Sequence, residues 1–160
     1  MKNIIFIILV FFVLSFANCG SQALDDKFTV YNHHYYFHTQ LENLKKYGFT
    51  EKERFQYGKF DTKTASLTLY DLKSWEAKKT LHLKHYKENV FYVEGYEKIF
   101  LLLEKDLELS FIKDKDDVKS YIAGGYGEDL TSLEACKAHA ERVRKEIEEA
   151  QQCDGCQGPM

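Results

Sequence analysis

The chain has 160 residues, of which 44% are hydrophobic, 15% aromatic and 29% charged, and its net charge is −3. This is enough apolar material for one globular domain, and the abundance of aromatic residues with a single proline argues against intrinsic disorder. An acidic chain without a basic run lacks the positive surface that a phosphate backbone requires, so no nucleic-acid partner is expected.

The first 23 residues have the pattern of a secretory signal. Lys2 provides a positive start, and residues 4–17 form an apolar run of 14 residues, which is shorter than the roughly 20 needed to span a bilayer. Small residues at 15 and 17 and at 21 and 23 fit two cleavage sites. The chain therefore divides into a signal (1–23), a single globular domain (24–152) and a short C-terminal tail (153–160), and we expect it to be exported.

A third processing site ends at a cysteine. The residues Phe16-Ala17-Asn18-Cys19-Gly20 resemble the end of a bacterial lipoprotein signal, and Asn18 is similar to the relaxed, spirochaete-like form of that motif. The resemblance covers residues 1–20 only, and no family is recognised for the mature domain. It implies lipidation of Cys19 and a lipid-anchored protein of the cell envelope. Cleavage without lipidation would instead give a secreted or periplasmic soluble protein.

The mature chain begins with short elements. Residues 28–37 are rich in aromatic and β-branched side chains, which predicts a strand. Thr39 and Glu42 fit a capping box and Gly48 fits a helix stop, which together predict a two-turn helix over 40–47. Apolar residues then recur in short segments, mostly in alternation with polar ones, at 55–57, 67–69, 81–83, 90–93, 99–103 and 107–111. Tight turns at 87–89 and 104–106 indicate hairpins.

The last element is predicted to be a long helix. Thr131 and Glu134 fit a second capping box. Apolar residues follow at alternating spacings of three and four along one narrow seam, namely Leu133, Cys136, Ala140, Val143, Ile147 and Ala150. We expect this helix to pack on the sheet, and a homodimer through it is the alternative. The predicted fold class is α+β, an antiparallel β-meander of five or six strands with a short N-terminal helix and a long C-terminal helix packed on one face.

Three cysteines follow the signal. Cys153 and Cys156 form a CxxC motif, and in an oxidising compartment we expect a local disulfide between them. The motif follows a helix, where the dipole disfavours a thiolate, so redox and metal functions are less favoured. Cys136 lies 17 residues before Cys153, roughly 25 Å away along a helix, and is expected to be a buried free thiol.

Aromatic and histidine side chains at the start of the domain form the candidate binding surface, which comprises Tyr31, His34, Tyr36 and His38. On a strand, the last three would share one face. No carboxylate stands at a metal-ligand spacing from these histidines, so neither a metal site nor a cofactor is predicted. The segment 124–127, rich in glycine, is interpreted as a hinge loop.

The sequence predicts no catalytic residue, because it contains neither a GxSxG motif nor paired carboxylates in an apolar setting. A contact between the Cys136 thiol and the His139 imidazole is geometrically possible on a helix. The leading hypothesis is a non-enzymatic binding or interaction module of the envelope, with an unknown protein or small molecule as its partner. The alternative is an exported thiol or metal-binding protein that uses the CxxC motif.

Overall fold

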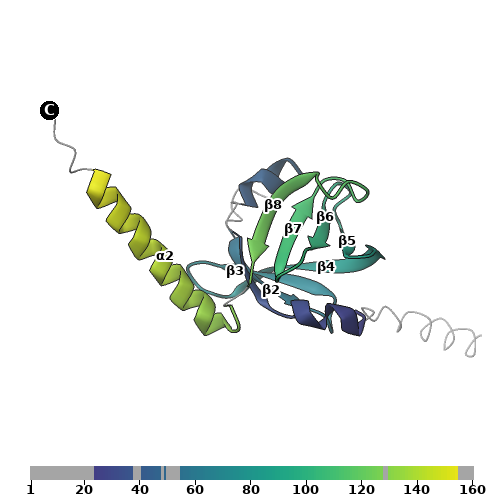
Figure 1. Ribbon diagram of the computed structural model, residues 1–160, viewed down its shortest axis with the longest axis horizontal. Helices are drawn as coiled ribbons and strands as arrows, with labels where there is room; N and C mark the ends of the chain where they lie inside the picture. Colours follow the sequence, from purple (N-terminus) through teal and green to yellow (C-terminus); the bar gives the residue numbers. More distant parts are fainter. Residues whose placement is uncertain (1–23, 38–40, 48, 50–54, 128–129, 155–160) are drawn as a thin grey trace, which may run out of the picture.

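The computed structural model describes residues 24–37, 41–47, 49, 55–127 and 130–154, in which eight antiparallel strands form a closed barrel (Figure 1). Each strand pairs with the next one along the chain, and the first also pairs with the last, which closes the sheet. The strands are β1 (His34–Phe37), β2 (Phe55–Asp61), β3 (Ser66–Asp71), β4 (Ala77–Lys87), β5 (Val90–Val93), β6 (Phe100–Leu103), β7 (Glu108–Ile112) and β8 (Tyr121–Tyr126).

Side chains fill the inside of the barrel. Along β1, Tyr35 and Phe37 point inward and are fully buried, while Tyr36 between them faces outward. An eight-stranded barrel is just wide enough for side chains to occupy its interior. The same alternation brings inward-facing aromatic and aliphatic residues from the other strands into one core, including Phe60, Leu67, Leu69, Leu81, Leu83, Phe91, Leu101, Leu109 and Phe111.

Two short 3₁₀ helices, η1 (Asp26–Tyr31) and η2 (Leu41–Tyr47), lie at opposite ends of the barrel (Figure 1). From η1, Phe28 packs against Phe91, with ring centroids 5.1 Å apart. At the η2 end, Leu44 and Phe49 are buried in the same core. Both helices therefore contribute apolar side chains that cover the ends of the barrel.

The predicted β-meander of five or six strands was wrong, because the described residues form eight strands that close into a barrel. Residues 124–126 of the segment interpreted as a hinge loop belong to the last strand, β8. Gly125 of β8 pairs with Phe37 of β1 at the point where the barrel closes. A Cβ atom at Gly125 would lie 2.9 Å from the Tyr36 carbonyl oxygen and 2.9 Å from the Phe37 ring. The glycine thus permits the close approach of the first and last strands, and it also removes the apolar alternation that marks a strand.

The N-terminal elements also differ from the prediction. The strand predicted over 28–37 is confined to β1, since η1 occupies Asp26–Tyr31. The short N-terminal helix predicted over 40–47 is the 3₁₀ helix η2 rather than an α-helix. Both predicted hairpin turns are confirmed, and each places a non-glycine residue at positive φ, Glu88 at 50° and Asp106 at 59°.

The C-terminal helix α2 (Leu133–Asp154) starts one residue later than the second capping box suggests. Ser132 caps it, because its hydroxyl oxygen accepts a hydrogen bond from the Ala135 amide at 3.1 Å. The expected packing along one face of the sheet was wrong. Only the first turns of α2 pack on the barrel, and the rest projects away from it (Figure 1).

Candidate functional site, the joint between the barrel and the projecting helix

The first turns of α2 lie on aromatic side chains that point outward from the barrel. We name these the outer aromatic cluster, which consists of Tyr36, Tyr57, Tyr70, Trp75, Tyr126 and His139. The four tyrosines come from β1, β2, β3 and β8, Trp75 comes from the β3–β4 turn, and His139 comes from α2. Outward-facing positions of four strands therefore meet the helix at one place.

His139 is the centre of this joint. It is 8% exposed, and each of its ring nitrogens lies near a tyrosine hydroxyl. The Tyr57 hydroxyl is 2.9 Å from Nδ1, and the Tyr126 hydroxyl is 3.3 Å from Nε2. Each tyrosine hydroxyl can donate a hydrogen bond to its ring nitrogen or accept one from it, so both ring nitrogens have a partner. The Tyr36 ring packs beside it, with centroids 4.8 Å apart.

The protonation states at the joint do not suit nucleophilic chemistry. Burial raises the pKa of the Cys136 thiol to about 11, and burial together with Tyr36 raises the pKa of Tyr57. Thiol and phenol therefore stay neutral near pH 7, whereas an activated nucleophile requires a lowered pKa. Cys136 is a fully buried free thiol, as the sequence predicts. The joint is built to hold α2 in place.

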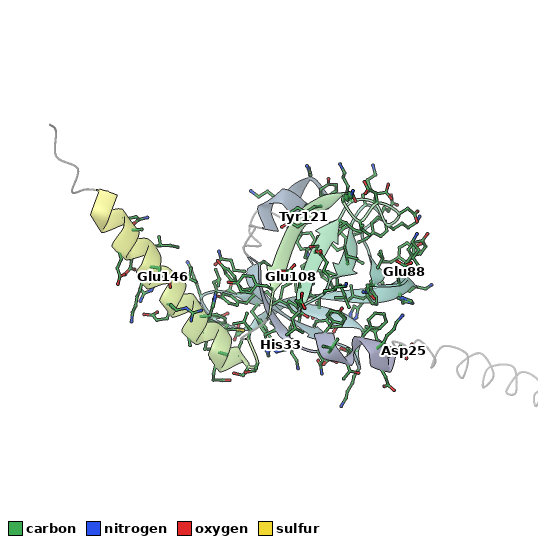
Figure 2. The ribbon with its side chains drawn as sticks, viewed as in Figure 1. Asp25, His33, Glu88, Glu108, Tyr121 and Glu146 are labelled. Carbon is green, nitrogen blue, oxygen red and sulfur yellow. The ribbon has the colours of Figure 1, made fainter. Side chains whose placement is uncertain are left out.

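The second half of α2 presents a different surface. The seam residue Cys136 is fully buried, whereas Ile147, further along the same seam, is 52% exposed. Neighbouring charged side chains form ion pairs within the helix, with Arg144 Nη2 at 2.7 Å from Glu141 and Arg144 Nη1 at 3.6 Å from Glu148. In Figure 2, Glu146 marks this half, which stands away from the barrel. The apolar seam of α2 therefore extends past the part of the helix that the barrel covers.

The structure brings His34 and Tyr36 of the predicted binding surface to the outer aromatic cluster and places Tyr31 against the barrel core instead. Tyr36 belongs to the outer aromatic cluster, and His34, only 9% exposed, stacks on Tyr70 with centroids 6.1 Å apart. Burial, followed by the nearby charge of Lys59, lowers the pKa of His34. Tyr31 lies in η1 against the barrel core, where its carbonyl accepts a hydrogen bond from the Tyr35 hydroxyl at 3.1 Å. His38 lies outside the described residues.

Other predicted sites fall partly or wholly outside the described chain. Cys19 and Cys156 are not among the described residues, and Cys153 is in the last turn of α2. Within the part of the chain that the structure describes, no group of three or more His, Cys, Asp or Glu side chains could hold a metal ion. The same residues include no helix with the length and apolar character of a membrane span.

Comparison with known proteins gives no relative. No protein-family model, no curated protein and no solved structure matches the chain. The function is therefore inferred from the fold and from the joint.

Sequence reasoning missed the role of His139. Tyr57 and His139 are 82 positions apart, and neither stands in a motif that points to the other. The available signal was weak. His139 is close to Cys136 and Ala140 on the helix, so it borders the buried part of the seam.

Proposed function

We propose that this protein is a non-enzymatic interaction module of the cell envelope, anchored by a lipid at Cys19, that engages a protein partner through the second half of α2. The observation that carries the proposal is the loss of burial along one helical seam. Cys136 is fully buried, Ala140 and Val143 are intermediate, and Ile147 is half-exposed. The core side chains occupy the barrel interior, so we assign binding to the outside of the molecule.

A projecting helix of this kind is suited to a partner. Isolated helices shorter than about 12–15 residues are marginal in water, and the half of α2 beyond the joint is about that long. An amphipathic helix gains stability when its apolar residues enter a groove or meet another helix. The Ile147 and Ala150 side chains, exposed on the seam, are the anchors that such a partner would cover.

The proposed anchor and the helix fit one orientation at a membrane. The chain enters the barrel at Leu24, whose amide donates a hydrogen bond to the Thr62 carbonyl at 2.9 Å, close to η1. A tether from Cys19 to this point reaches at most ~18 Å. In Figure 1 the free end of α2 rises from the level of η1 toward that of η2. An anchor at Cys19 would therefore direct the free end of α2 away from the membrane.

Site-specific photo-crosslinking in the cells that export the protein tests the role of α2. A photoreactive residue at Ala150 should give a discrete adduct, and one at His82, exposed on β4, should give none. Ile147→Glu should abolish the adduct from position 150 while leaving the fold intact. An adduct of twice the protein's mass would identify a second copy as the partner. Absence of an adduct, or an adduct insensitive to Ile147→Glu, would contradict the proposal.

The anchor is tested separately by the intact mass of the protein purified from membranes. We expect a chain that begins at Cys19 and carries the mass of acyl groups. A chain that begins at Asn18 or Leu24 without acyl mass would refute the anchor and leave the role of α2 to the crosslinking result.

A further inference from the structure

An open pocket of about 420 Å³ lies at the η2 end of the barrel, and none of its lining residues belongs to the outer aromatic cluster. Lys46 and Tyr47 at the end of η2 form one side, and the β5–β6 connection forms the other with Gly95, Tyr96, Glu97 and Lys98. A volume of this size is within the range of about 300–1,000 Å³ that small-molecule sites occupy in proteins. The pocket is thus large enough for a small ligand.

Among the described residues that line the pocket, lysines outnumber carboxylates, although the whole chain is acidic. The pocket is lined by two ammonium groups, Lys46 and Lys98, and by one carboxylate, Glu97. Lysine pairs with carboxylates through short, charge-assisted hydrogen bonds.

The other lining groups restrict which anion fits. Tyr47 and Tyr96 are half-buried, with part of each side chain against the barrel core and the rest at the pocket. Lys46 Nζ lies 5.2 Å from the centroid of the Tyr47 ring. Phe49 packs on the Tyr96 ring, with centroids 5.1 Å apart. Each tyrosine ring is therefore partly covered, and it offers a ligand its remaining surface and its hydroxyl. Glu97 can accept hydrogen bonds from ligand hydroxyls, and its charge opposes ligands that carry several negative charges.

From this combination we infer that the pocket binds a small hydroxylated monocarboxylate of the sugar-acid class. Lys46 and Lys98 hold the carboxylate, Glu97 accepts from the hydroxyls, and the tyrosine rings contact the carbon skeleton. A ligand of this class has about 13 non-hydrogen atoms, and drug-like ligand efficiency then gives a Kd of about 1 mM. The inference is independent of the proposed role of α2, since the two sites share no residue.

Titration of the folded protein with sodium glucuronate, followed by amide NMR, tests the inference. We expect saturable shifts at Gly95, Tyr96 and Glu97, and at least tenfold weaker binding of glucose and of acetate. Glucose lacks the charge that the lysines recognise, and acetate lacks the hydroxyls and the ring face. Absence of shifts at 20 mM glucuronate, about 20 times the expected Kd, would overturn the inference, as would equal binding of acetate.

Three variants with exposed substitutions complete the test. Lys46→Gln combined with Lys98→Gln should weaken glucuronate binding at least tenfold. Lys137→Gln, on α2 and outside the pocket lining, should not change it. Glu97→Gln removes a negative charge that repels carboxylates, so it should strengthen acetate binding. The ratio of glucuronate affinity to acetate affinity should therefore fall. Glucuronate binding that survives the double substitution unchanged would place the ligand elsewhere and refute the assignment.

Discussion

At the residue scale, the joint between α2 and the barrel depends on the contact between Tyr57 and His139. The two side chains are buried, and the hydroxyl lies 2.9 Å from Nδ1. Tyr57→Phe removes this partner from a buried ring nitrogen, so we expect the free energy of unfolding in urea to fall by about 1–3 kcal/mol. Tyr126→Phe is the matched control. Tyr126 is 37% exposed and 3.3 Å from Nε2, so water can replace its hydroxyl and a smaller loss is expected. Equal losses would show that the two contacts are equivalent.

Adding a single methyl group at Gly125 tests whether the barrel closes there as the structure shows. In Gly125→Ala the new Cβ would lie 2.9 Å from the Tyr36 carbonyl oxygen. Backbone cannot yield easily there, so we expect a loss of about 1–3 kcal/mol in the free energy of unfolding. At Gly124 the nearest atom to an added Cβ is the Tyr121 hydroxyl at 3.0 Å, on a side chain that is 49% exposed and can move. Gly124→Ala should therefore cost less. A harmless Gly125→Ala would mean that β1 and β8 are further apart than the structure shows.

The pH dependence of stability should carry a signature of Cys136. Burial raises the pKa of its thiol from 9.0 to about 11. Between these values the unfolded chain releases the thiol proton while the folded chain keeps it, so stability is lost as the pH rises. Urea unfolding of the wild type and of Cys136→Ala at pH 7 to 11 measures the effect. We expect the wild type to lose more stability than the variant above about pH 9, whereas parallel curves would contradict the buried thiol.

At the element scale, α2 has two halves with different roles. Its first half is part of the fold, since Cys136 is fully buried and His139 is 8% exposed. In its second half, the Ile147 side chain is 52% exposed. We therefore expect Ile147→Ser to change the free energy of unfolding by less than about 0.5 kcal/mol. Cys136→Ser, which buries a hydroxyl in the joint, should cost about 1–3 kcal/mol. Comparable costs would indicate that the second half is also packed in the monomer.

The elements that the sequence predicts well are those whose signal is local. The turns at 87–89 and 104–106 and the start of α2 follow from neighbouring residues, and all three are correct within a residue or two. Closure of the barrel is not local. It depends on β8, where Gly124 and Gly125 obscure the alternation, and on pairing between Phe37 and Gly125. The sequence shows the apolar spacing of the α2 seam. It does not show that the barrel covers Cys136 and leaves Ile147 exposed.

At the scale of the whole molecule, the barrel is a filled scaffold whose surfaces differ from end to end. One end receives the chain at Leu24 and is covered by η1. The other end holds the pocket between η2 and the β5–β6 connection. The projecting half of α2 stands to one side (Figure 1). With a lipid at Cys19, as we propose, the pocket and the free end of α2 would both face away from the membrane.

Native-state hydrogen exchange, resolved by residue, tests the central claim of a closed barrel with a partly uncovered helix. Amides paired across the β1–β8 closure should exchange only through global unfolding, because neither strand has a free edge. Amides beyond Ile147 in α2 should exchange orders of magnitude faster, since little tertiary packing holds them. Fast exchange in β1 and β8 would indicate an open sheet. Protection of the end of α2 equal to that of the barrel would contradict a projecting helix.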